Sequence, residues 1–244
     1  KNGEVLDLEP PHDHLGQVIG EFLPENPKFR SMMEKSFDIL NSHPLNVQRA
    51  AEGKNKANSL WFWGAGTKPA LQNFKDKTGL TGTMISAVDL LKGIAVGAGM
   101  HSVDVPGATG SLDTNYAGKA QAALDALLKE GSDFVYIHLE GPDEMGHQGE
   151  LEHKVQAIAY IDEKIVAAVK AGLDAAGEEY RILVLPDHPT PIRCRTHTSD
   201  PVPFVLYDSS KPHDLGCGFT EKEARQSGIT VDHGYDLIQK LIGG

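Results

Sequence analysis

The sequence has little cysteine, a shortage of positive charge and no long apolar run. Cys194 and Cys217 are the only cysteines among 244 residues, which argues against a disulfide framework and favours a reducing, cytoplasmic location. Lys and Arg number 23 against 34 Asp and Glu, so the net charge is −11 and a broad basic face is not expected. Apolar runs reach only about six to eight residues, whereas a membrane span needs roughly 18. We therefore expect a soluble protein that binds neither nucleic acid nor membranes.

The composition is that of a globular protein, with 40% hydrophobic and 23% charged residues. From residue 58 onward, apolar runs typical of strands alternate with helical segments. Helical spacing of apolar residues predicts one long amphipathic helix over Leu151–Leu173. Strands joined by helices predict an α/β fold with a mostly parallel sheet that is covered on both faces. Six strands are expected, at Ser59–Trp63, Thr83–Val88, His101–Val105, Phe134–Leu139, Arg181–Leu185 and Pro203–Tyr207.

Residues 1–57 differ from the remainder of the chain. They predict a short strand at Val5–Leu8 and one helix that begins at Asn26-Pro27 and runs to Leu40. A polar link at Glu52–Lys56 then marks a candidate domain boundary, which divides the chain into residues 1–57 and 58–244. The sequence opens KNGEV, without an initiator Met. We expect the 244 residues to be the C-terminal part of a longer protein.

Polar residues that follow the expected strands are the candidates for chemistry, because ligands of open α/β sheets lie at the carboxyl ends of strands. After Phe134–Leu139, Pro142 and its neighbouring glycines predict a loop that carries Asp143 and His147. A carboxylate and an imidazole four residues apart can chelate one cation. This loop is the first half of the candidate site.

Two further loops complete the candidate site. Asp187 and His188 lie among three prolines after the fifth run, and His197 precedes the sixth. Mixed imidazole and carboxylate ligands suit Zn, Mn or Fe, and five ligands exceed what one four-coordinate catalytic site needs. A single His after a strand is more often only hydrogen-bonded, but three such groups, each following a predicted strand, favour a metal site, and the five ligands favour two metals. A metal pair suits phosphoryl transfer.

Arginines next to these loops are candidates for binding an anion. The guanidinium groups of Arg193 and Arg195 could each hold a phosphate or carboxylate in a bidentate fork. The alternative is that both are ordinary exposed loop residues. The sequence alone leaves the two interpretations open.

The combined motifs resemble the archaeal-type cofactor-independent phosphoglycerate mutases of the alkaline phosphatase superfamily. The resemblance covers nearly the whole chain. It rests on the segments Pro10–Asp13, Trp61–Gly66, Ile85–Ile94, Pro106–Gly110, Leu112–Tyr116, Asp143–Gly149, Asp187–Pro191 and Thr196–Pro203.

That resemblance implies a three-layer α/β/α core, with residues 1–57 as the C-terminal part of an inserted α+β domain. It implies two divalent metal ions (Mn, Zn or Mg) and no bisphosphoglycerate. Lys92 would face the phosphate of a small phosphorylated substrate. One metal would be bound by Asp143, His147 and His197, and the other by Asp187 and His188.

The expected activity is the interconversion of 3-phosphoglycerate and 2-phosphoglycerate through a phosphoserine, a step of glycolysis. The serine nucleophile of the family has no match in this chain and is expected upstream of Lys1. Gly141, Met145 and Gln148 also depart from the family's Ala, Ala and Glu, which are not ligands. Alternatives are a phosphatase or another phosphomutase of the same superfamily, or an inactive metal-binding fragment. The oligomeric state is not readable from the sequence.

Overall fold

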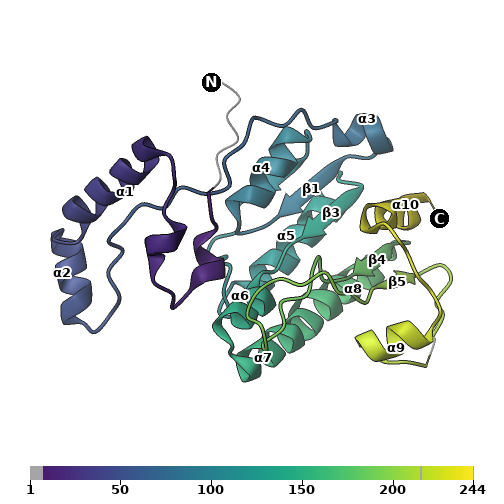
Figure 1. The fold of residues 1–244 in the computed structure, drawn as a ribbon. Coiled ribbons are helices and arrows are strands. Elements are labelled where there is room, and N and C mark those ends of the chain that lie inside the picture. Colours follow the sequence, from purple (N-terminus) through teal and green to yellow (C-terminus); the bar gives the residue numbers. More distant parts are fainter. Residues whose placement is uncertain (1–7, 215, 244) are drawn as a thin grey trace. The chain divides into compact units, whose positions relative to one another are not determined.

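The computed structural model describes residues 8–214 and 216–243, and the chain forms two compact units, Lys1–Pro69 and Ala70–Gly244 (Figure 1). In the first unit, two short 3-10 turns, η1 (Pro11–His14) and η2 (Ile19–Phe22), precede helices α1 (Pro27–Leu40) and α2 (Pro44–Ala51). The side chain of Asn26 caps α1 by accepting from the amide of Lys28 at 3.0 Å. The helix predicted to end at Leu40 is confirmed.

No strand forms at Ser59–Trp63, so that prediction was wrong. The backbone there bonds to side chains instead of a neighbouring strand: the amide of Leu60 donates to Oγ of Ser36 at 2.8 Å. The strand predicted at Val5–Leu8 lies, except for Leu8, outside the described residues. The assignment of residues 1–57 to an inserted domain stays a prediction.

The second unit is built on a parallel three-stranded sheet in the order β2-β1-β3. Its strands are β1 (Gly82–Ile85), β2 (His101–Val103) and β3 (Phe134–Ile137), and each overlaps a predicted run but ends earlier than predicted. The crossovers are α4 (Asp89–Gly97) and α5 (Tyr116–Leu128), while α3 (Phe74–Thr78) precedes β1. The central strand β1 is buried along its whole length. This arrangement confirms the expected α/β class with parallel strands joined by helices.

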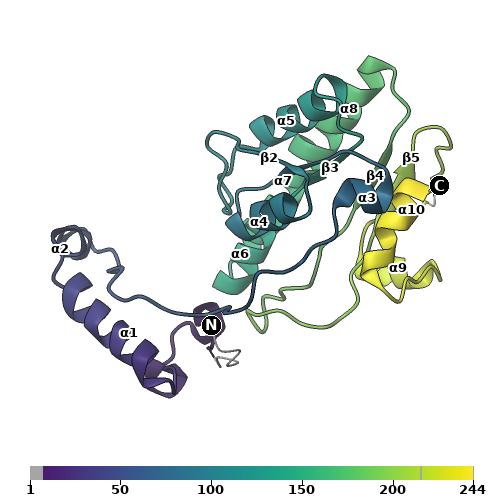
Figure 2. The same ribbon diagram turned by 90° about the horizontal axis from the view of Figure 1, so that it is seen from above.

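Helices cover both faces of the sheet (Figure 2). One layer holds α5, α7 (Leu151–Ile161), the π-helical stretch η3 (Asp162–Val166) and α8 (Ala167–Ala176), and α4 lies on the opposite face. The long helix predicted over Leu151–Leu173 is confirmed as the continuous run from α7 through α8. The core between sheet and helices includes the buried side chains of Ile85, Ala123, Ile165 and Leu173. The three layers are those of the expected α/β/α core.

The last two strands depart from the parallel pattern. The strands β4 (Arg181–Val184) and β5 (Val205–Asp208) pair antiparallel as a separate two-stranded sheet. The connection between them contains five prolines and no helix, so it cannot serve as the helical crossover that a parallel neighbour requires. The described chain ends with α9 (Glu221–Gln226), η4 (Gly234–Asp236) and α10 (Leu237–Gly243). Within the described ranges, no helix is long and apolar enough to cross a membrane.

Candidate metal centre

The segment expected to be a loop after β3 is instead the helix α6 (Gly141–Gln148). Pro142 occupies the first turn of this helix, where the missing N–H of a proline has no intrahelical partner to lose. The prediction used Pro142 as a strand stop and missed its second role as a helix start. The helix places Asp143 and His147 one turn apart on one face, with Nε2 of His147 at 3.4 Å from Oδ2 of Asp143.

A third candidate ligand reaches this helix from the loop after β4. Nε2 of His197 lies 3.1 Å from Nε2 of His147 and 3.3 Å from Oδ1 of Asp143. One ligand atom from each of the three residues lies within 4.8 Å of the others. Ligands placed tetrahedrally at metal distances of about 2.0–2.1 Å are separated from one another by about 3.3–3.4 Å. The donor set and its spacing therefore fit a divalent cation.

The ring of His147 is held so that one nitrogen faces the cluster. Its Nδ1 lies 2.9 Å from the main-chain carbonyl oxygen of Arg195, which can only accept, so Nδ1 carries the proton. The lone pair of Nε2 is then free of a proton and points toward His197 and Asp143, as a metal ligand requires. Arg195 has a φ of +53°, which is unusual for a residue other than glycine.

The carboxylate of Asp143 is oriented by a neighbouring loop. Its Oδ1 accepts a hydrogen bond from the hydroxyl of Thr190, which is buried. Nζ of Lys154 donates to the carbonyl of the same Thr190 at 2.8 Å. Burial lowers the pKa of Lys154, and the charge of Asp143 opposes that shift. These contacts hold the carboxylate of Asp143 in one orientation, as the second-sphere hydrogen bonds of a metal site do for its ligands.

Asp187 and His188 lie beside this cluster. Nδ1 of His188 is 4.0 Å from Oδ1 of Asp143, and its ring packs against that of His197 with centroids 3.7 Å apart. Oδ2 of Asp187 lies 3.6 Å from Nε2 of His188 and faces solvent. The five predicted ligands thus lie in one region at the ends of β3 and β4.

The side chains of the predicted substrate-binding residues contact groups other than the three ligands of the triad. Lys92 is in α4 and forms an ion pair of 2.6 Å with Asp104, which follows β2. Nη2 of Arg193 lies 3.8 Å from Oδ2 of Asp200. The guanidinium of Arg195 lies over the glycine that ends α6, Gly149. None of the described contacts tests a role in substrate binding.

Sequence reasoning missed several buried or half-buried polar residues near the site. Thr190 and Lys154 are two of them. Thr190 stands between two prolines in the Asp187 loop, a signal that could have identified it, whereas nothing in the sequence pattern singles out Lys154.

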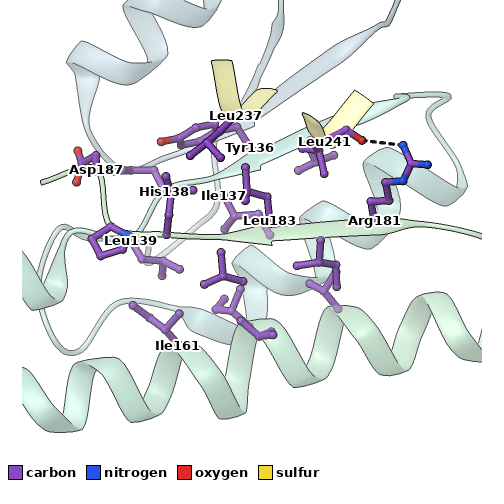
Figure 3. Close-up of a pocket in the computed structure, with 18 of the residues that line it drawn as sticks. Tyr136, Ile137, His138, Leu139, Ile161, Arg181, Leu183, Asp187, Leu237 and Leu241 are labelled. Atoms are coloured by element: carbon purple, nitrogen blue, oxygen red, sulfur yellow. Dashed lines mark hydrogen bonds between the residues drawn. The ribbon is translucent and has the colours of Figure 1, made fainter. Parts of the chain in front are cut away.

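A second buried polar group lies at the ends of β1 and β3. His138 Nδ1 lies 3.2 Å from Oγ of Ser86, and the buried Lys119 donates to the carbonyl of His138 at 3.1 Å. Burial lowers the pKa of both His138 and Lys119. Figure 3 shows His138 and Asp187 at the same end of a pocket. This group belongs to the polar surroundings of the candidate centre.

Comparison with known proteins gives consistent matches. The family model described as "Metalloenzyme superfamily" matches residues 3–235. A probable 2,3-bisphosphoglycerate-independent phosphoglycerate mutase of Geobacter sulfurreducens is 47% identical over 99% of this chain and 61% of its own length. The corresponding mutase of Methanothrix thermoacetophila is 47% identical over 96% of this chain and 60% of its own length. The chain therefore spans about three fifths of the length of these relatives.

Two solved structures resemble the fold. A protein from Pyrococcus horikoshii is 32% identical, with a TM-score of 0.62 over 80% of this chain and 50% of its own. A cofactor-independent phosphoglycerate mutase from Thermoplasma acidophilum is 25% identical, with a TM-score of 0.52 over 88% of this chain and 51% of its own. The alkaline-phosphatase-like α/β fold is therefore shared with proteins of this kind. The family match and the triad together indicate binding of a divalent metal.

Proposed function

The chain belongs to the Metalloenzyme superfamily, and on that premise we propose that the protein containing it is a metal-dependent phosphoglycerate mutase. It interconverts 3-phosphoglycerate and 2-phosphoglycerate and needs no bisphosphoglycerate. The observation that carries the proposal is the convergence of Asp143, His147 and His197 on one point next to Asp187 and His188. The names of the relatives support the choice of substrate.

Two divalent ions, Mn, Zn or Mg, are proposed for this cluster. Asp143, His147 and His197 hold one, and Asp187 with His188 contributes to the other. Imidazole and carboxylate donors are the ligands that such ions take in hydrolytic and phosphoryl-transfer sites. When bound, the ions neutralise charge on the phosphoryl oxygens and favour ionisation of an attacking hydroxyl.

The protein's own residues orient and hold the reactants. Thr190 keeps Asp143 facing the cluster, and the carbonyl of Arg195 keeps the proton of His147 on Nδ1. Arg193, Arg195 and Lys92 are proposed to hold the anionic groups of a small phosphorylated metabolite.

A serine supplied from outside these 244 residues is proposed as the nucleophile. Its oxygen bonds to phosphorus while the ester bond to the glycerate oxygen breaks, and the phosphoryl group then returns to the other hydroxyl. Water must be excluded meanwhile, because hydrolysis of the phosphoserine would release phosphate. We assign that enclosure to the domain of which residues 1–57 form the C-terminal part.

A coupled enolase assay on the full-length protein with Mn²⁺ tests the proposal. We expect 2-phosphoglycerate from 3-phosphoglycerate, with turnover lowered at least about 100-fold in His147→Ala, because a metal ligand is lost. The matched control is His153→Ala, which removes an exposed imidazole of α7 that pairs with Glu150 and should leave turnover unchanged. Release of inorganic phosphate without 2-phosphoglycerate would indicate a phosphatase and contradict the mutase.

Binding of Mn²⁺ separates the two proposed metal positions. Asp187→Ala should remove the weaker of two calorimetric binding events and leave the other in place. His147→Ala should remove the stronger one, because its three donors converge. A single binding event in the unsubstituted full-length protein would contradict the two-metal assignment.

A further inference from the structure

His138 is a half-buried histidine to which the proposed mechanism gives no role. It directly follows Ile137, the last residue of β3, and its side chain lines a cavity of about 1650 Å³ within the second unit. The lining of this cavity also includes Asp143, Asp187 and His188, which are three of the candidate metal ligands. In Figure 3, His138 and Asp187 lie at the same end of the cavity. The imidazole of His138 therefore lies next to the space in which a metal and its ligands would meet.

The hydroxyl of Ser86 fixes the position of the proton on this ring. Ser86 is buried, and its Oγ accepts from the amide of Val88 at 3.0 Å and lies 3.2 Å from Nδ1 of His138. Among the described residues, Nδ1 is the only acceptor within hydrogen-bond distance of that hydroxyl, so the hydroxyl donates and Nδ1 accepts. Burial lowers the pKa of His138, so the ring is neutral near pH 7 and its single proton lies on Nε2. His147 has the opposite tautomer, with its proton on Nδ1.

The main chain at His138 is also held on both sides. Its amide donates to the carbonyl of Ile85 at 2.9 Å, and its carbonyl accepts from Nζ of Lys119 at 3.1 Å. Lys119 is 1% exposed, so water does not compete for this hydrogen bond. Ser86, the partner of the ring, directly follows the buried central strand β1. Both the backbone and the ring of His138 are therefore fixed by buried groups.

The Nε2–H group of His138 has no hydrogen-bond acceptor within the described part of the chain. Nε2 lies on the far side of the ring from Nδ1, and Ser86 does not line the cavity whereas His138 does, so Nε2 points into the cavity. The carboxylate of Asp187 already accepts from the amide of His188 at 3.1 Å and lies more than 4.0 Å from the ring of His138. A donor that faces an apolar cavity without an acceptor is costly, which favours a bound group at this point.

We propose that His138 donates a hydrogen bond from Nε2 to an anionic oxygen at the metal position assigned to Asp187 and His188, and that Ser86 is the positioning residue that keeps the proton on Nε2. A donor held in one direction before the anion arrives needs no reorganisation to bind it. The oxygen belongs either to the phosphoryl group of the substrate or to a carboxylate that completes the metal site, since two protein ligands leave that site incomplete. The inference rests on the proposed function for the location of the metal and the phosphoryl group.

Nitrogen NMR of the metal-free full-length protein tests the position of the proton. In protein labelled with 15N-histidine, long-range 1H–15N correlation shows which ring nitrogen bears the proton. We expect Nε2 for His138 and Nδ1 for His147, and we expect His138 to lose its single tautomer in Ser86→Ala. A proton on Nδ1 of His138, or an unchanged tautomer in Ser86→Ala, would overturn the proposal. This measurement involves no turnover, so its result does not depend on the mutase activity.

Binding measurements on variants of the full-length protein identify the acceptor. His138→Leu removes the donor, whereas His138→Gln retains an amide N–H near the place of Nε2. The matched control is His101→Leu, which removes an exposed imidazole from β2. Calorimetric titration with Mn²⁺, and of the Mn²⁺-loaded protein with inorganic phosphate, compares the two sources of the oxygen. We expect His138→Leu to weaken one of these affinities about 10–100-fold, and His138→Gln to stay within about threefold of the unsubstituted protein.

The two titrations give distinct outcomes. Weaker phosphate binding at unchanged Mn²⁺ affinity would identify the phosphoryl oxygen as the acceptor, and a loss of Mn²⁺ affinity would identify the carboxylate. The proposal would be overturned by equal affinities in His138→Leu and His101→Leu, or by equal losses in His138→Leu and His138→Gln. Release of phosphate in place of 2-phosphoglycerate would contradict the mutase assignment and leave these binding results interpretable.

Discussion

The main-chain carbonyl of Arg195 accepts a hydrogen bond from Nδ1 of His147, at 2.9 Å and 48 residues away along the chain. Because this acceptor belongs to the main chain, no side-chain substitution at residue 195 removes it directly. Only the conformation of residue 195 decides where this oxygen points, and that conformation is left-handed, with φ at +53°. The backbone at one position thus sets the proton position on a candidate ligand in another segment.

This relationship predicts opposite outcomes for two substitutions that remove the same guanidinium. Arg195→Gly should preserve Mn²⁺ affinity, because glycine adopts the left-handed region without cost. Arg195→Val should lower that affinity about 10–100-fold, because a β-branched residue disfavours positive φ and displaces the carbonyl. Isothermal titration with Mn²⁺ distinguishes them. Equal affinities in the two variants would show that the carbonyl does not orient His147.

Thr190 is expected to act on metal affinity through Asp143. Thr190→Val keeps the shape of a buried side chain but removes the hydroxyl that donates to Oδ1 of Asp143, so we expect about 10–100-fold weaker Mn²⁺ binding. Thr190→Ser retains the hydroxyl and should bind nearly as the unsubstituted protein does. Titration at constant pH measures both. Weak binding in both variants would point to packing of the methyl group instead.

Gly146 is expected to tolerate no side chain, because α6 approaches the Thr190 loop closely. A Cβ at this position would lie 2.5 Å from the carbonyl oxygen of Thr190 and 2.9 Å from Nζ of Lys154. We expect Gly146→Ala to lower the free energy of unfolding by about 1–3 kcal/mol. Gly93→Ala is the control, since a Cβ in that position of α4 meets nothing within 4 Å and should stabilise the helix by roughly 0.5–1 kcal/mol. Urea unfolding measures both, and similar midpoints would contradict the close approach.

The β4–β5 pair is expected to weaken in acid. Hydrogen bonding from the Ser210 hydroxyl, and then from Arg181, lowers the pKa of Asp208 to about 2. Because this folded-state pKa lies below the usual 3.8, the unfolded chain binds the proton more readily. The contribution of Asp208 to stability is thus complete above about pH 4 and is lost as the pH falls toward 2. Unfolding midpoints of Asp208→Asn and the unsubstituted protein should differ at pH 5 and converge near pH 2; a constant difference would contradict the shift.

Local patterns in the sequence were sufficient for much of the fold. Short apolar runs bounded by glycine, proline or charge located five of the six strands predicted after residue 58, and the spacing of apolar residues located the helix from Leu151. These signals succeed because each depends on burial of one face by nearby residues. The prediction of a strand at Ser59–Trp63 was wrong because these residues pair with other groups instead of a neighbouring strand. The amide of Leu60 donates to the hydroxyl of Ser36, and the indole N–H of Trp61 donates to the carbonyl of Glu9.

The candidate ligands were also predictable, but their support was not. Asp143 and His147 follow the expected strand at Phe134–Leu139, and His197 lies between the expected strands at Arg181–Leu185 and Pro203–Tyr207, so each stands near an expected strand end. The hydroxyl of Thr190, the amine of Lys154 and the carbonyl of Arg195 reach the cluster only through tertiary packing of α6 against the loop after β4. No spacing in the sequence encodes those distances. Pro142 shows the related ambiguity, since the same residue ends a strand and begins a helix.

The three candidate ligands come from two segments that are far apart in the chain, and an ion bound to them acts as a crosslink. It closes a loop of about 50 residues between His147 and His197. In the chain-entropy treatment of disulfides, closing a loop of that length stabilises the folded protein by about 4 kcal/mol, because it lowers the conformational entropy of the unfolded chain. Both cysteines of this chain are free, so a divalent ion can provide the crosslink between distant segments that a disulfide provides in other proteins.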